Sequence, residues 1–144
     1  MAKYSTTVHS PMSVEQTFDY MADFSNAAEW DENTVSSECI SGDPDQEGAR
    51  YRVVTEFGRR ELTLTYETIE YIPHSRVVLS SSTALAGIED VMTFAPADGG
   101  TEITYEANVQ PKGLARILDP VFGRIFKSVG DRAAESMRKT LQAK

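Results

Sequence analysis

The sequence predicts an α+β fold: an antiparallel sheet of about seven strands covered by a long C-terminal helix, with two short helices after the first strand. Two observations support this prediction. From residue 34 to residue 109, apolar and polar residues alternate with a period of two, which is typical of strands covered on one face. From residue 120 onward, apolar residues recur at helical spacing. A chain of 144 residues predicts a single domain over residues 1–144.

The N-terminal segment predicts one strand and two short helices. Residues 3–9, KYSTTVH, alternate like a strand, and Pro11 ends it. Ser13 and Gln16 fit a capping box, in which each side chain satisfies a free amide at the start of the helix. A second short helical piece is expected from about residue 25 to residue 30.

Six further strands follow in close succession: TVSSECIS, ARYRVVTEF, ELTLTYETIEYI, RVVLSSS, IEDVMTFAP and TEITYEANV. Gly58-Arg59 predicts a tight hairpin, and residues 73–75 and 97–100 predict turns. Strands spaced this closely pair as antiparallel neighbours. The apolar phase slips after Tyr66, which predicts a β-bulge near Thr68 that helps to bend the sheet.

The C-terminal segment predicts a strongly amphipathic helix. A first turn or two over residues 113–119 is interrupted by Pro120, which lacks an amide hydrogen but is favourable in the first turn of a new helix. One face then carries Phe122, Val129 and Ala133, flanked by Phe126 and Met137 among others. This face is expected to lie against the covered face of the sheet.

Composition excludes several classes of function. The formal net charge is −8 and the sequence pI is about 4.7, which argues against a nucleic-acid partner. No apolar run reaches the length of a membrane span, so no integral membrane segment is expected. The N-terminus lacks the apolar core of a secretory signal, so a cytoplasmic protein is expected. The single Cys39 excludes an intramolecular disulfide. His9 and His74 are too far apart in the sequence to suggest a metal site, and no metal or other cofactor is expected.

Polar side chains interrupt the covered face of the predicted sheet. They are Tyr51, Thr55, Tyr66, Asp90 and Tyr105, which share their strand faces with Val, Leu, Met and Phe. A hydroxyl or carboxylate buried without a partner is costly, so these groups must satisfy one another or be satisfied by water or a ligand. Apolar walls with a few convergent polar groups are typical of a small-molecule pocket.

Four segments spread over essentially the whole chain carry a resemblance to a known superfamily. They are SPMSVEQTFDYMADFSNAAEW, YETIEYIPHSRVV, ADGGTEITYEA and KGLARILDPVFGRIFKSVGDRAAESMRKTL. With the predicted order of elements, they resemble the START/SRPBCC superfamily with its helix-grip fold, and most of all its polyketide cyclase/dehydrase-like branch. The resemblance implies a START-like domain in which a curved sheet wraps around the last helix and leaves a hydrophobic cavity between them. It implies no shared catalytic motif, because the family shares a cavity rather than a set of catalytic residues.

The predicted ligand-binding residues combine the inward strand positions with the apolar face of the last helix. They are Trp30, Tyr51, Thr55, Leu64, Tyr66, Asp90, Met92, Tyr105, Phe122, Phe126, Val129, Ala133 and Met137. Trp30 is expected near the mouth of the cavity, as a packing residue or as a lid. Asp90 is the one candidate catalytic residue, since burial would raise its pKa toward neutrality and fit it for proton transfer. Alternatively, Asp90 is solvated near a strand end or paired with Arg52 or Arg76.

Three functional hypotheses follow. The first is binding of a hydrophobic small molecule, namely a lipid, isoprenoid, quinone or polyketide-like compound, by a monomer or homodimer. The second is a polyketide cyclase or dehydratase that uses Asp90 with the cavity tyrosines. The third is an interaction module, because residues 111–144 hold eight of the 14 Lys and Arg residues but only three of the 22 acids. In that case Arg124, Lys127 and Arg138 would dock the C-terminal helix on an acidic partner or a lipid surface.

Overall fold

A computed structural model describes residues 2–113 and 120–144 of the chain. Its seven strands form one antiparallel sheet in the order β1-β7-β6-β5-β4-β3-β2. The strands are β1 (Ala2–Ser10), β2 (Thr34–Ser41), β3 (Arg50–Phe57), β4 (Arg60–Ile72), β5 (Arg76–Ser82), β6 (Ala86–Ala97) and β7 (Gly100–Pro111). The helices are α1 (Val14–Ala22), the 3₁₀ turn η1 (Phe24–Asn26), α2 (Ala27–Trp30) and α3 (Pro120–Gln142). The predicted α+β architecture is confirmed, whereas the first helical turn or two expected over residues 113–119 lies outside the described residues from residue 114 onward.

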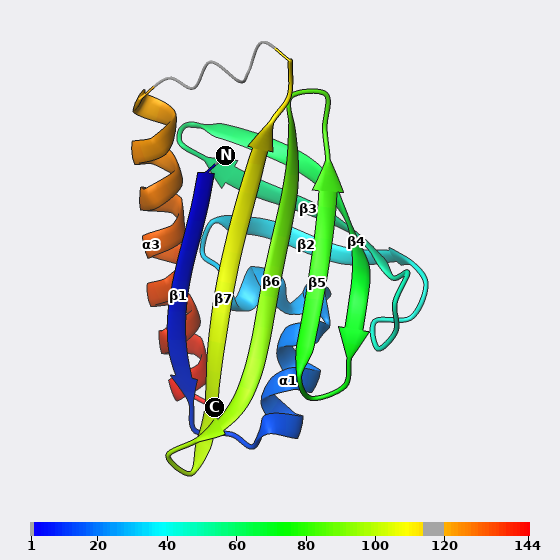
Figure 1. Cartoon of the computed structure of the whole chain (residues 1–144), viewed down its shortest axis with the longest axis vertical. Coiled ribbons are helices and arrows are strands. Elements are labelled where there is room, and N and C mark those ends of the chain that lie inside the picture. Colours follow the sequence, from blue (N-terminus) through cyan, green and yellow to red (C-terminus); the bar gives the residue numbers. More distant parts are fainter. Residues whose placement is uncertain (1, 114–119) are drawn as a thin grey trace.

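The sheet bends strongly, so that β2 and β3 run across the direction of β1, β7 and β6 (Figure 1). The predicted bulge is present, because the register between β4 and β5 shifts between Thr68 and Glu70. Two more register shifts interrupt the pairing of β2 with β3. Bulges increase the local twist of a strand, which lets one sheet curve around the helices on its inner face.

Local sequence signals explain the two short helical segments. The hydroxyl of Ser13 accepts from the Gln16 amide at 3.1 Å, and the Gln16 side chain accepts from the Ser13 amide at 3.3 Å, which confirms the capping box. The second expected piece is divided: the Asp23 side chain caps η1, and α2 continues as a single turn to Trp30. Both helices direct apolar side chains into the core beneath the sheet.

Helix α3 lies alongside β1 at one flank of the sheet (Figure 1). Gly130 permits this close approach, because a Cβ at this position would lie 2.5 Å from Cδ2 of the Tyr4 ring. The second half of α3 is well covered and buries Met137 and Leu141 completely. The first half is covered less, and the apolar side chains of its inner face stay half-buried.

The inner face of the sheet follows the predicted alternation, with departures on β4. Ile69, which was expected to turn inward after the slip in apolar phase, is 47 % exposed, whereas Thr68 is buried. Tyr51, Val53, Leu64 and Met92 are buried, together with the neighbouring apolar residues of β5, β6 and β7. Leu62 shares their phase but is 39 % exposed. It lies close to the end of the β3–β4 hairpin, where the cover of α3 is incomplete.

Candidate functional site

Three polar side chains lie together on the inner face of the sheet. Asp90 on β6 pairs through its backbone with Ala107 on β7, two residues from Tyr105. Tyr66 projects from β4 into the same space, and electrostatic coupling joins it to both Asp90 and Tyr105. The relative exposures of Asp90, Tyr66 and Tyr105 are only 5 %, 7 % and 8 %. We call these three residues the inner polar cluster.

Burial makes Asp90 a weak acid. Its pKa rises from the ordinary 3.8 to about 7, chiefly because the carboxylate is removed from water. The Tyr105 hydroxyl stabilises the carboxylate and opposes this rise, whereas the charges of Asp31 and Glu89 add to it. Burial also raises the pKa of both tyrosines well above the ordinary value of 10.0, so their hydroxyls stay protonated. Near neutral pH the cluster therefore combines a carboxyl group that exchanges a proton with two neutral hydroxyl groups.

The two arginines considered as partners of Asp90 bind other acids. Arg52 pairs with Glu38, and Arg76 pairs with Glu70 at 2.6 Å. Every lysine and arginine that the structure describes is at least partly exposed. Among the described residues, Asp90 therefore has no buried cation to neutralise it, which accounts for the direction of its pKa.

Asp31 and Asn33 lie beside the inner polar cluster, and the sequence pattern identified neither of them as a site residue. The Asp31 carboxylate accepts from the Asn33 amide at 2.9 Å, from Asn33 Nδ2 at 3.0 Å and from the Thr34 hydroxyl at 3.2 Å. Asn33 Nδ2 also donates to the Val129 carbonyl of α3 at 2.8 Å. Asp31 thus orients the amide that fastens the middle of α3 to the start of β2. We call Asp31 and Asn33 the helix clasp.

The carboxyl group of Asp31, a half-buried residue, is a second acid close to the inner polar cluster. Burial raises its pKa above 3.8, and the hydrogen bonds from Asn33 and Thr34 lower it in part. Its charge also raises the pKa values of Asp90 and Tyr105, which places it within electrostatic reach of both. The segment Asp-Glu-Asn-Thr after Trp30 carries a local signal for this arrangement. Asp and Asn side chains at a helix end commonly form hydrogen bonds with nearby backbone amides.

Several polar atoms in the interior have no hydrogen-bond partner among the described residues. They are Trp30 Nε1, Asn33 Oδ1, Thr68 Oγ1 and Ser81 Oγ, and each is sealed from solvent. Tyr51 OH is sealed in the same way, but a hydrogen bond from the Phe24 backbone partly offsets the rise that burial causes in the Tyr51 pKa. A buried polar group left without a partner costs about 1–3 kcal/mol. These atoms are positions where a water molecule or a ligand oxygen or nitrogen atom can supply the missing hydrogen bond.

Aromatic rings form the walls around the inner polar cluster. The Trp30 ring packs edge-on against Tyr105, with centroids 6.0 Å apart, and Phe24 packs against Tyr66 at 5.2 Å. The structure places Trp30 deep in the core beside Tyr105, whereas the sequence suggested a position at the mouth. Leu64, Met92, Ala133 and Met137, all predicted ligand-binding residues, are buried in the same interior.

The first half of α3 and the β3–β4 hairpin form an apolar margin at one end of this interior. Phe122 lies 5.4 Å from Phe57 and 6.0 Å from Phe126 between ring centroids. All three are half-buried, as are Ile125 and Val129.

Of the other predicted site residues, Thr55 is half-buried and donates its hydroxyl to the Asn33 carbonyl at 3.3 Å. The predicted residues therefore divide between the interior around Asp90 and this margin.

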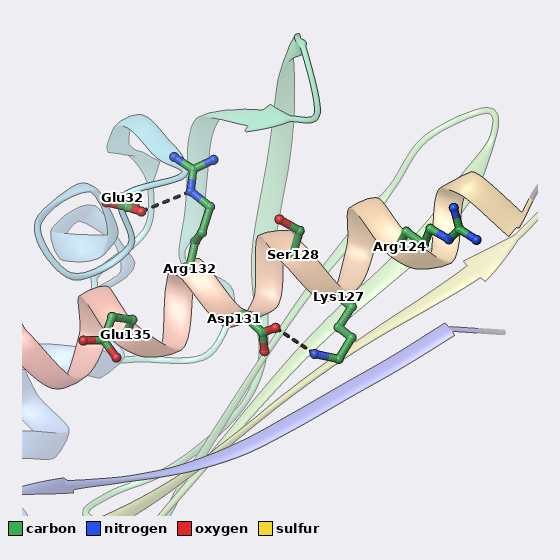
Figure 2. A pocket seen from close by; sticks show the side chains of 7 residues that line it. All are labelled: Glu32, Arg124, Lys127, Ser128, Asp131, Arg132 and Glu135. Atoms are coloured by element: carbon green, nitrogen blue, oxygen red, sulfur yellow. Dashed lines mark hydrogen bonds and ion pairs between the residues drawn. The ribbon is translucent and has the colours of Figure 1, made fainter.

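Two surface depressions lie away from the inner polar cluster. One, of about 470 Å³, lies on the solvent-facing side of α3 and is lined by Glu32, Arg124, Lys127, Ser128, Asp131, Arg132 and Glu135 (Figure 2). Ion pairs cross it between Lys127 and Asp131 and between Arg132 and Glu32. The other, of about 450 Å³, lies over the outer face of β1, β7, β6 and β5. Their charged linings differ from the apolar walls of the interior.

Within residues 2–113 and 120–144, no helix is long and apolar enough to span a membrane. The same residues contain no cluster of three or more His, Cys, Asp or Glu side chains suited to hold a metal ion.

Comparisons with known proteins agree with this architecture. A START superfamily protein from Mycobacterium smegmatis superposes with a TM-score of 0.80 at 12 % identity, covering 98 % of this chain and 97 % of that one. The Zhui aromatase/cyclase from Streptomyces sp. R1128 superposes with a TM-score of 0.77 at 12 % identity, covering 96 % and 90 %. A protein from Thermus thermophilus gives a TM-score of 0.76 at 12 % identity, covering 97 % and 95 %. At such identities the likeness shows the fold alone.

The comparison with curated proteins gives no match. The sequence itself matches one protein family from residue 1 to residue 142, which is nearly its whole length. This match shows that the chain belongs to the polyketide cyclase/dehydrase and lipid transport family.

Proposed function

We propose that the protein binds a hydrophobic small molecule between the inner face of the sheet and α3. The observation that supports this most is the set of interior polar atoms without protein partners, within walls of aromatic and aliphatic side chains. A ligand with an apolar body and a few polar groups complements such an interior. The half-buried margin of Phe57, Phe122 and Phe126 provides an apolar path toward it.

The first test is native mass spectrometry of freshly purified protein, compared with its denatured mass. We expect an additional mass that is lost on denaturation. Leu64→Trp should displace the ligand, because Leu64 is buried on the inner face. Thr63→Trp is the matched control, since Thr63 is exposed and one residue away on the opposite face. Absence of any retained mass, together with no thermal stabilisation by apolar compounds, would contradict the proposal.

The pKa of Asp90 supports a second candidate, a polyketide cyclase or dehydratase. A carboxyl group with a pKa of about 7, close to two protonated tyrosines, is suited to general acid–base work. In a dehydration, the Asp90 carboxylate would take a proton from the carbon next to a carbonyl, and the C–H electrons would form the new C=C bond. The β-hydroxyl would leave as water with a proton from Tyr105, which Asp90 would then reprotonate.

This second candidate requires turnover that depends on Asp90. With a polyketide-like β-hydroxyketone as substrate, Asp90→Asn should abolish product formation while binding persists. Glu89→Gln, on the exposed neighbouring position, should leave the rate unchanged. An undiminished rate in Asp90→Asn would exclude this role.

The third hypothesis, docking through the basic C-terminal helix, has less support. Lys127 pairs with Asp131 at 2.8 Å, Arg132 pairs with Glu32 at 3.1 Å, and Arg138 pairs with Glu135. These acids already neutralise much of the positive charge that the sequence places on α3. Exposed ion pairs of this kind contribute only about 0–1 kcal/mol each. Salt at about 0.5 M screens exposed charges, so an association that persists there would exclude docking through the basic side chains of α3.

A further inference from the structure

We propose that Asp31 and Asp90 make the interior reject anionic ligands and accept neutral molecules that carry hydroxyl or keto groups. This inference rests on the proposed ligand-binding function and narrows its ligand class. The interior should therefore bind a phenol, an alcohol or a hydroxyketone more tightly than a carboxylic acid of the same shape.

The first argument is the distribution of charge around the interior. Asp90 is buried on the inner face of the sheet, and Asp31, at the C-terminal end of α2, is close enough for its charge to act on Asp90. The other ionisable groups that act on this pair are Tyr66 and Tyr105, which stay neutral, and two exposed acids, Glu89 beside Asp90 and Glu32 beside Asp31. No described lysine, arginine or histidine is buried there to offset a negative charge. A ligand carboxylate would therefore enter a region that already holds two acids.

The second argument is the chemistry of the unpartnered atoms. Trp30 Nε1 can only donate a hydrogen bond, and Asn33 Oδ1 can only accept one. The hydroxyls of Thr68 and Ser81 can do both. A purely hydrocarbon ligand would leave these atoms unsatisfied, whereas ligand hydroxyl and keto groups match this mixture of donors and acceptors.

The third argument is the shape and chemistry of the walls. Phe24, Trp30, Tyr66 and Tyr105 pack against one another at ring-centroid distances of 5.2–6.0 Å. Aromatic side chains of this kind favour stacked or edge-on contacts with planar ligands. The inner polar cluster is part of the same group of rings, so a planar ring with an oxygen substituent can contact walls and cluster together.

The test compares three probes of one shape: 2-naphthol, 2-naphthoic acid and naphthalene. At pH 8 the naphthol is neutral, the naphthoic acid is ionised and Asp90 is largely ionised, because its pKa is about 7. Dissociation constants are measured by fluorescence titration and calorimetry on the full chain. We expect the naphthol to bind at least ten-fold more tightly than naphthoate and several-fold more tightly than naphthalene.

Asp90→Asn tests the origin of the discrimination. Removing one acid should reduce the ratio of the naphthoate and naphthol dissociation constants several-fold. Glu89→Gln, on the opposite and exposed face of the same strand, should change this ratio far less, because the Glu89 charge is the smallest of the influences on Asp90. Circular dichroism and thermal melting verify that both variants are folded. The three-probe comparison on the unaltered protein stands by itself if either variant fails to fold.

The possible outcomes distinguish a failure of this inference from a failure of the proposed function. Naphthoate binding as tightly as naphthol, or a retained natural ligand that proves to be a carboxylic acid, overturns the charge selection and leaves ligand binding intact. Naphthalene binding as tightly as naphthol overturns the requirement for oxygen substituents. If no probe binds and no mass is retained, both the inference and the proposed function are overturned.

Discussion

Replacement of Asp90 by asparagine should stabilise the protein at alkaline pH and leave it nearly unchanged at acid pH. Asn keeps the shape of the side chain but has no charge to bury. In the folded protein the pKa of Asp90 is about 7, against an ordinary 3.8 in the unfolded chain. The folded state therefore binds more protons between these two values, and the free energy of unfolding falls as the pH rises through that range.

The size of the effect follows from the same two values. A pKa raised from 3.8 to about 7 corresponds to at most about 4 kcal/mol lost above pH 7, at about 1.4 kcal/mol for each tenfold change. For a chain of this length, that difference corresponds to roughly 10 °C in melting temperature. This decrease in the free energy of unfolding is complete above about pH 7 and absent below about pH 4. Asp90→Asn should abolish the decrease.

The assay is urea denaturation of the original protein, Asp90→Asn and Glu89→Gln at pH 4 and pH 8. The difference between the original protein and Asp90→Asn isolates Asp90 from the other titrating groups, including Asp31. Glu89 is the matched control, because it is exposed on the outer face one residue away. Parallel pH profiles for the original protein and Asp90→Asn would refute the conclusion that Asp90 is buried as a weak acid.

Two further predictions concern how α3 is held against the sheet, and both use urea denaturation. Gly130→Ala should destabilise by about 1–3 kcal/mol, because its Cβ would lie 2.5 Å from the Tyr4 ring; Gly123→Ala, with no neighbouring atom within 4 Å, should stabilise by up to about 1 kcal/mol. Equal stabilisation by both substitutions would contradict the close approach of α3 to β1. Asn33→Ala should cost about 2–3 kcal/mol, since it removes a buried amide that bonds to α3 and to Asp31. Asn108→Ala, which removes one bond to a strand neighbour, should change stability by less than about 1 kcal/mol, and similar losses for the two variants would contradict the role of the helix clasp.

Much of the fold could be predicted from the sequence because its determinants are local. The period-two alternation marks the strands, Ser13 and Gln16 set the start of α1, and Gly58-Arg59 sets a hairpin. Each of these signals involves residues within a few positions of one another. Asp90 could be assigned to the inner face on the same basis, since alternation along a strand fixes which face a side chain occupies.

The tertiary structure alone decided what lies opposite each inward side chain. The bond from Asn33 to Val129 joins residues 96 positions apart, and no local pattern predicts such a pair. The depth of Trp30 and the incomplete cover around Leu62 depend likewise on how far α3 extends over a bent sheet. The pKa of Asp90 is set by burial and by Asp31, which the chain brings near only when it is folded. Alternation determined the face that each residue occupies, whereas long-range packing determined its neighbours and therefore its chemistry.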